Sequence, residues 1–170
     1  RITLWTKDQA SKFINKIIQD VDIVFGNLGV MVDLYDFKTN SINDYIQLEK
    51  ATLSASKALS DLGNFEQIGM TIRNQINANE NVLGGLIKTS DGVFLSKPIK
   101  TRIIDRIGGG DAFVAAALHG IINQWKGNEI INFAANAYSI TQTFLGDINI
   151  MKENEINKIS SHENQGHLTR

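Results

Sequence analysis

Apolar residues near the start of the chain recur at the spacing of one helix face. In residues 6–21 they stand three or four positions apart, at Ala10, Phe13, Ile14, Ile17 and Ile18. Thr6 and Asp8 stand just before the first of these apolar residues, and the side chain of either one can cap the free amides at a helix start. The pattern therefore predicts a helix over 6–21, and the apolar run 21–27 that follows it predicts a short strand.

A second helix is predicted over residues 41–63. Ser41 and Asp44 stand three positions apart, which resembles a capping box with an acid in its third position, and Gly63 provides a stop. Four short β-rich runs follow, at 65–73, 82–89, 92–98 and 100–105, and the sequence Ser-Asp-Gly between the second and third predicts a hairpin turn. The last third returns to helix, at 110–123, 128–143 and 153–160.

Helices on both sides of short strands indicate an α/β fold of layered α/β/α type, for which we expect a mainly parallel sheet. No internal repeat, low-complexity tract or obvious linker interrupts the 170 residues, so we expect a single domain over 1–170. The content of hydrophobic residues, 42%, is ample for a packed core.

Charge and composition narrow the class of partner. The chain has 17 Lys and Arg against 18 Asp and Glu, a net charge of −1, which gives no broad basic surface for nucleic acid or an anionic membrane. A small-molecule partner is the simpler expectation. The absence of cysteine excludes disulfides and thiolate sites and agrees with a cytoplasmic location. No apolar run is long enough to span a bilayer, and the start lacks the order of a signal peptide.

Residues 105–113, Asp-Arg-Ile-Gly-Gly-Gly-Asp-Ala-Phe, are the segment most suggestive of chemistry. A phosphate loop of the GxxxxGK[ST] type needs lysine and a hydroxyl residue after its last glycine, where this chain has Asp111 and Ala112. A dinucleotide fingerprint needs a further glycine at the position of Phe113, which disfavours a dinucleotide-dependent enzyme. A glycine-rich helix start nevertheless attracts anions through its free amides.

Asp111 has two interpretations on local chemistry. A carboxylate beside a phosphate-binding helix start would repel the phosphate unless it faced a second reactant, such as a hydroxyl that it orients and deprotonates. The alternative is that Asp111 caps the helix and the glycines serve only the geometry of a turn.

The motif resembles the signature of the ribokinase-like, phosphofructokinase-B (PfkB) type carbohydrate kinases, and its version in 2-keto-3-deoxygluconate kinases most of all. Four further segments are similar to motifs of that family and follow in the same order: 1–5 (RITLW), 70–73 (MTIR), 144–147 (FLGD) and 165–170 (QGHLTR). The resemblance spans nearly all of the chain. It implies an incomplete ribokinase-like fold, the C-terminal, nucleotide-binding half of a kinase that lacks the N-terminal half and its lid.

The resemblance also implies roles for single residues. Asp111 would be the catalytic base toward the terminal hydroxyl of the sugar acid, in an ATP- and Mg²⁺-dependent phosphorylation of 2-keto-3-deoxygluconate to its 6-phosphate. The other implied site residues are Gly108, Gly109 and Gly110 as the anion hole for the γ-phosphoryl group, Arg1 and Asp147 toward the substrate, Thr71 and Arg73 beside the nucleotide phosphates, Asn136 at the adenine, and Asp105 at a monovalent cation.

Two departures from the family pattern keep alternatives open. After the strand 21–27 the family has Asn-x-x-Glu, whose acid helps to organise magnesium, whereas this chain has Val30 at the glutamate position. The missing half would carry the lid that excludes water. The alternatives are therefore a vestigial nucleotide-binding module without catalysis, or a ribokinase-like kinase for another sugar, of the fructose or ribose type. Sheet edges left open would favour a homo-oligomer or a complementing N-terminal chain.

The three histidines suggest no metal site. His119 follows the glycines on a predicted helix, where we expect it to pack rather than to react. His162 and His167 lie in a polar tail without a partner at ligand spacing, so no zinc site is predicted.

Overall fold

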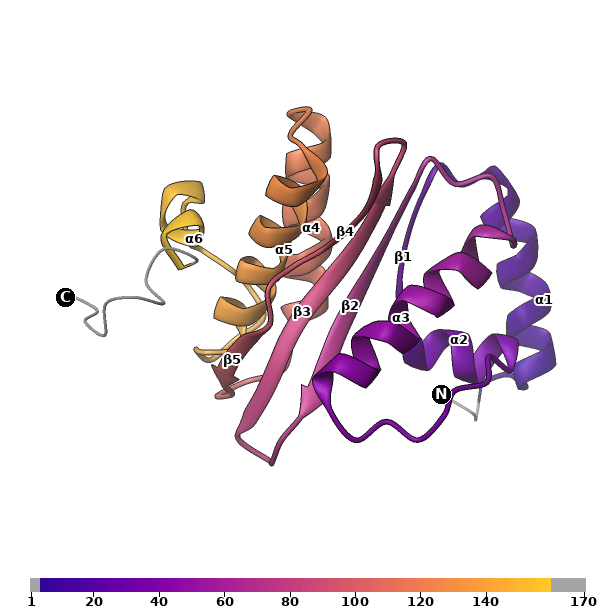
Figure 1. Cartoon of the computed structure of the whole chain (residues 1–170), viewed down its shortest axis with the longest axis horizontal. Helices are drawn as coiled ribbons and strands as arrows, with labels where there is room; N and C mark the ends of the chain where they lie inside the picture. Colours follow the sequence, from indigo (N-terminus) through magenta and orange to yellow (C-terminus); the bar gives the residue numbers. More distant parts are fainter. Residues whose placement is uncertain (1–3, 160–170) are drawn as a thin grey trace.

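A five-stranded sheet separates two groups of helices in the computed structural model, which describes residues 4–159 (Figure 1). One group comprises α1 (Lys7–Ile17), α2 (Leu28–Tyr35) and α3 (Tyr45–Ser60), with a short 3₁₀ turn, η1 (Ile18–Asp20), after α1. The other comprises α4 (Gly109–Ile122), α5 (Gly127–Thr141) and α6 (Glu153–Ile159). The predicted layered α/β/α fold is confirmed.

The expectation of a mainly parallel sheet is wrong. The strands are β1 (Ile23–Asn27), β2 (Gln67–Gln75), β3 (Glu80–Thr89), β4 (Gly92–Leu95) and β5 (Ile99–Arg102). Only β1 and β2 pair in parallel, with Asn27 opposite Thr71. The pairs β2–β3, β3–β4 and β3–β5 are antiparallel. The physical reason is connection length, because a parallel connection needs a crossover of about a dozen residues or more, and only β1 and β2 have helices between them.

The first residues of α1 and α3 show which of the predicted helix caps are present. Thr6 caps α1 as predicted: its hydroxyl accepts a hydrogen bond from the Gln9 amide at 3.3 Å, and the Gln9 side chain accepts one from the Thr6 amide at 2.9 Å. Ser41 does not begin the second predicted helix. That helix, α3, starts at Tyr45, and the carboxylate of Asp44 accepts from the Gln47 amide at 2.8 Å.

Helix α2 was not predicted at all. It begins directly after β1, where the side-chain oxygen of Asn27 accepts a hydrogen bond from the Val30 amide at 3.0 Å and so caps the helix. The remaining strands and helices agree with the predicted ones to within a few residues, including the Ser90–Asp91 turn between β3 and β4.

Phe113 anchors α4 to the sheet. Its side chain is 1% exposed, and its ring centroid lies 6.1 Å from that of Tyr138 on α5 and 6.4 Å from that of Phe25 on β1. The ring sits over Gly85 of β3, where any Cβ would collide with it. This packing fixes the N-terminus of α4 against the sheet.

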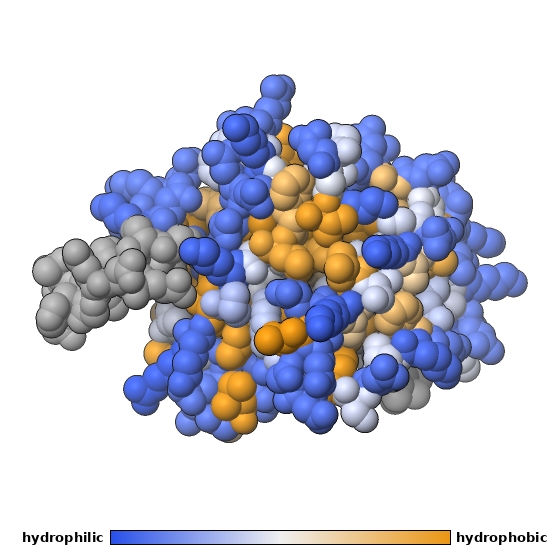
Figure 2. Space-filling model, viewed as in Figure 1, coloured by the Kyte–Doolittle hydropathy of each residue, from blue (hydrophilic) through white to orange (hydrophobic). Residues whose placement is uncertain are grey.

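Polar side chains surround a limited apolar area on the outside of the molecule. Figure 2 shows apolar residues gathered in the middle of the face that Figure 1 presents, over the sheet. Within residues 4–159, no helix has the length and apolar character that crossing a membrane requires.

Candidate active site

The glycines of residues 108–110 form the start of α4. Gly108 has φ 77° and ψ −12°, a left-handed conformation that favours glycine, and no side chain caps the helix. A Cβ on Gly108 would collide with the backbone carbonyl group of Asp147. A Cβ on Gly109 would come within 2.9 Å of the Gln142 side chain, whereas Gly110 has open space beside it. Close packing thus requires glycine at position 108, a Cβ at position 109 would need the end of the Gln142 side chain to shift, and Gly110 leaves an approach to the helix start.

Asp111 is the third residue of α4 and does not cap it. Gly108 holds the cap position, so the alternative that Asp111 serves as the helix cap is wrong. The side chain is exposed, and no hydrogen bond or ion pair joins it to another residue in the range 4–159. A carboxylate in the first turn of a helix without a partner in the protein is free to face a reactant.

A cavity of about 560 Å³ opens beside this helix start. It joins the end of β1, helix α2, strand β2 and the segment that leads into α4. The polar side chains among its lining include Asn27, Asp33, Thr71, Arg73 and Arg106, and Gly110 borders it at the helix start. The structure therefore brings three of the residues predicted from the sequence, Thr71, Arg73 and Gly110, to one place.

Two arginines make this cavity suitable for an anion. The guanidinium group of Arg106 donates a hydrogen bond to the Ala78 carbonyl at 2.9 Å, which tethers it beside the β2–β3 turn. Arg73 lies near Tyr138: burial raises the pKa of the Tyr138 hydroxyl, and the positive charge of Arg73 partly opposes that rise. Guanidinium groups and a helix N-terminus are the groups that hold phosphate oxygens in proteins.

Asp105 holds the glycine segment in place. Its two carboxylate oxygens accept hydrogen bonds from the amides of Ile107 at 3.1 Å and Gly146 at 3.3 Å. These backbone hydrogen bonds, from Ile107 first and then from Gly146, lower the pKa of Asp105. The carboxylate thereby ties the segment before α4 to the loop that carries Asp147. Its predicted contact with a monovalent cation stays a prediction.

Apart from Thr71, Arg73 and Gly110, the predicted site residues within 4–159 do not line this cavity; these are Asp105, Gly108, Gly109, Asp111, Asn136 and Asp147. Asp147 is exposed, and its backbone lies beside Gly108. Asn136 is buried in α5 and donates a hydrogen bond to the Ile156 carbonyl at 3.1 Å. It lines a different cavity, of about 420 Å³, with Trp125 and Phe133. Arg1 lies outside residues 4–159.

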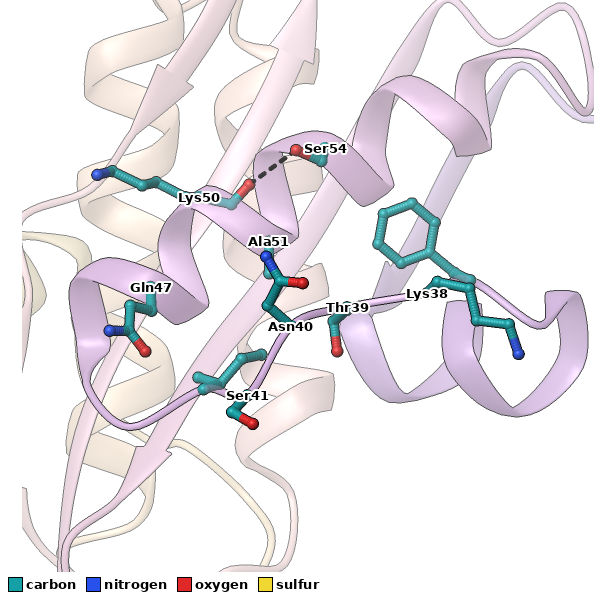
Figure 3. Close-up of a pocket in the computed structure, with 10 residues that line it drawn as sticks. Lys38, Thr39, Asn40, Ser41, Gln47, Lys50, Ala51 and Ser54 are labelled. Atoms are coloured by element: carbon teal, nitrogen blue, oxygen red, sulfur yellow. Dashed lines mark hydrogen bonds between the residues drawn. The ribbon is translucent and has the colours of Figure 1, made fainter.

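A further cavity, of about 460 Å³, lies between α3 and the segment 37–42 that precedes it (Figure 3). Two lysines border it, but Figure 3 shows the amines of Lys38 and Lys50 directed to opposite sides rather than toward a common point. None of the predicted site residues lines it.

His119 packs as expected. Its ring lies edge-on to Trp125 at 5.2 Å and beside Phe133 at 5.8 Å, and its Nε2 is 3.0 Å from a carboxylate oxygen of Glu153. Among residues 4–159 no group of three or more His, Cys, Asp or Glu side chains is arranged to hold a metal ion. His162 and His167 lie outside the described residues.

Solved structures resemble this chain over nearly its whole length. No protein-family model and no curated protein sequence matches it. The 2-dehydro-3-deoxygluconokinase from Thermotoga maritima superposes with a TM-score of 0.84 at 25% identity, over 95% of this chain and 48% of that one. A PfkB family carbohydrate kinase from Listeria grayi gives a TM-score of 0.74 at 26% identity, over 95% and 48%. The chain has the fold of half a PfkB-family carbohydrate kinase.

Other PfkB-type neighbours agree. An Enterococcus faecalis protein assigned as a 2-keto-3-deoxygluconate kinase gives a TM-score of 0.74 at 26% identity, over all of this chain and 50% of that one. An E. coli protein assigned as ribokinase II, solved in complex with ATP and Mg²⁺, gives 0.63 at 14% identity, over 91% and 44%, a likeness of fold alone. The chain thus spans about half the length of the kinases that it resembles.

Arg106 and Asp33 are the charged lining residues that sequence reasoning missed. Arg106 stands inside the quoted glycine motif, so its position was a usable signal. Asp33 lies on α2, a helix that the sequence pattern did not predict, so no signal in the sequence placed Asp33 at the site.

Proposed function

We propose that this chain is the nucleotide-binding half of an ATP-dependent carbohydrate kinase that phosphorylates 2-keto-3-deoxygluconate on its 6-hydroxyl. The observation that carries the proposal is the single cavity that joins Thr71 and Arg73 of β2 to Gly110 at the start of α4, one residue before Asp111. Two of the structural neighbours bear names of kinases for this sugar acid.

The proposed chemistry is transfer of the γ-phosphoryl group of ATP. Asp111 orients the sugar hydroxyl and accepts its proton, a bond forms between that oxygen and the γ-phosphorus, and the bond to the β,γ-bridging oxygen breaks to release ADP. The amides of residues 108–110 hold the phosphoryl oxygens while charge moves, and Arg73 and Arg106 offset the negative charge. Positioning and charge stabilisation carry most of such a reaction.

The remaining roles belong to the same proposal. Arg1 binds the carboxylate of the sugar acid as a guanidinium fork, and Asp147 hydrogen-bonds its hydroxyls. Asn136 borders the adenine, for which its burial beside Trp125 and Phe133 offers apolar neighbours. Asp105 contacts a monovalent cation in addition to holding the backbone amides of Ile107 and Gly146.

Open apolar surface supports a partner chain. Phe13 and Ile17 on α1 are 53% and 64% exposed, and strand β1 pairs with β2 on one edge only. A complementing N-terminal chain or a second copy of this chain would cover this surface and supply the parts of a kinase that lie outside the matched half.

A second candidate function is a module that binds nucleotide without catalysis. It is favoured by Val30, whose side chain cannot serve a hard cation at the position where the resemblance places a glutamate. A kinase for another sugar, of the fructose or ribose type, shares the same fold and would differ in the substrate that it accepts.

An ADP-release assay with 2-keto-3-deoxygluconate tests the proposal. We expect ADP formation that depends on the sugar acid and falls roughly 100-fold or more in Asp111→Asn, because a positioned base contributes about that factor or more. The affinity for ATP should change little. Asp61→Asn is the matched control, since Asp61 is an exposed carboxylate at the end of α3.

The outcomes separate the candidates. An Asp111→Asn variant that keeps most of its rate contradicts the role of Asp111. ATP binding without turnover on any sugar supports the non-catalytic module, and turnover on fructose or ribose alone supports a different kinase. A chain that does not bind ATP contradicts all three.

A further inference from the structure

Asp33 is the one carboxylate that borders the 560 Å³ cavity among the residues that the structure describes. It reaches the cavity because of helix α2: Val32 and Asp33 stand three and four positions after Gly29, on the same side of the helix, and all three line the cavity. Val30 lies off this face, does not line the cavity and is 39% exposed. Position 30 therefore has no carboxylate, but the carboxylate of Asp33, three residues later on the same helix, lines the cavity.

The charges that border the cavity would make phosphate binding there depend on a cation. Arg73 and Arg106 border the same cavity, but neither forms an ion pair with Asp33 within residues 4–159. Polyphosphate bound to the arginines and to the start of α4 would be opposed by the negative charge of Asp33. A divalent cation between the carboxylate and the phosphate oxygens removes this opposition.

The residues fit magnesium in particular. Mg²⁺ takes oxygen ligands, keeps several waters, and is commonly held by one or two carboxylates together with the phosphates of a nucleotide. Asp33 supplies one carboxylate, and no cluster of three or more candidate ligands exists in the described part of the chain. One carboxylate is too few to bind Mg²⁺ by itself. It is enough to bind the ion together with the phosphate oxygens of a nucleotide.

We propose that Asp33 on α2 is a ligand, directly or through water, of the Mg²⁺ of a bound Mg²⁺–nucleotide complex, and that the ion binds only together with the nucleotide. This inference rests on the proposed function, because it places the nucleotide phosphates in the same cavity. It assigns to Asp33 the part that Val30 cannot play.

Calorimetric titration with the non-hydrolysable analogue AMP-PNP tests the inference without any activity measurement. The wild-type chain is titrated with excess EDTA and again with excess Mg²⁺, and we expect Mg²⁺ to tighten binding about tenfold or more. Asp33→Asn should lose most of this enhancement and bind the metal-free analogue at least as tightly as wild type, because a repulsive charge is gone. Asp61→Asn should keep the wild-type enhancement.

Each outcome has a distinct meaning. Asp33→Asn with the wild-type Mg²⁺ enhancement, or a wild-type chain that binds equally well with and without Mg²⁺, would overturn the inference and leave the proposed function standing. No binding under either condition would overturn both. A circular dichroism spectrum equal to that of wild type shows that the variant is folded, which is expected because the Asp33 side chain is exposed and has no partner in the structure.

Discussion

Replacement of Gly108 by alanine should destabilise the protein strongly, although it adds a single methyl group. A left-handed backbone costs a residue with a Cβ roughly 1–2 kcal/mol, and Gly108 has φ 77°. The new Cβ also collides with the Asp147 carbonyl group, and forced overpacking costs about 1–3 kcal/mol. The sum predicts a loss of about 2–5 kcal/mol in the free energy of unfolding.

Gly110 provides a matched control two residues away. Its Cβ position has nothing within 4 Å, and its φ is not in the left-handed region. Alanine inside a helix is more favourable than glycine by about 0.5–1 kcal/mol, so Gly110→Ala should be slightly more stable than wild type. The two substitutions are chemically identical, and the structure predicts opposite signs for them.

Urea unfolding followed by circular dichroism measures both variants. For a chain of this length each kcal/mol changes the melting temperature by about 2–4 °C, so thermal melts should show Gly108→Ala lower by roughly 4–20 °C. Equal stabilities of Gly108→Ala and wild type would refute the reasoning, since they would mean that Gly108 neither adopts the left-handed conformation nor packs against Asp147.

Three further predictions concern the fold and the site. Phe113→Ala should cost about 3–5 kcal/mol in urea unfolding, because the ring is fully buried between α4, α5 and the sheet; a loss under 1 kcal/mol would contradict that packing. Asp44→Ala should cost about 1 kcal/mol through loss of the α3 cap, whereas Ser41→Ala should cost almost nothing; the reverse order would restore the sequence-based assignment of the cap. Asp105 has a pKa lowered below its unfolded value of about 3.9, so its contribution to stability is present above that pH and is lost as the pH falls through the lower folded value. Asp105→Asn should therefore be less stable than wild type at pH 6 and approach it in acid unfolding below about pH 4, and a difference that does not depend on pH would count against this explanation.

The helices were predicted well where the cap residues and the spacing of apolar residues indicated the same helix. The Thr6 cap, the glycines before α4 and the Ser90–Asp91 turn are each local chemistry, and the structure has all three. Helix α2 escaped prediction because its eight residues are mostly apolar around the helix and follow β1 without a break. The apolar pattern of a buried strand and that of a short buried helix are hard to tell apart.

Strand direction was the main error, and it has a physical explanation. Apolar pattern reports which face of a strand is buried but not which way the strand runs. The connections of four residues after β2 and two residues after β3 were visible in the sequence and permit antiparallel neighbours only, and β5 continues along the edge of β3 that β4 occupies. The lengths of these connections therefore predict an antiparallel arrangement of β2, β3 and β4.

The site was predicted in part. Thr71, Arg73 and Gly110 come together because β2 and the start of α4 border the same cavity, which motif order alone does not show. Asp33 reaches that cavity through a helix absent from the prediction, and Asn136 lies in a separate one. Tertiary packing decides such distances, and no single-sequence pattern contains them.

The central claim is that the start of α4 holds the phosphates of a nucleotide. Nuclear magnetic resonance of the ¹⁵N-labelled chain tests it most directly, through the backbone amide signals of Gly108, Gly109 and Gly110 during titration with AMP-PNP and Mg²⁺. The account predicts that these signals shift among the most of any in the spectrum, and that adenosine, which lacks phosphates, leaves them in place. Saturating AMP-PNP that shifts other amides and leaves these three unchanged would contradict the claim.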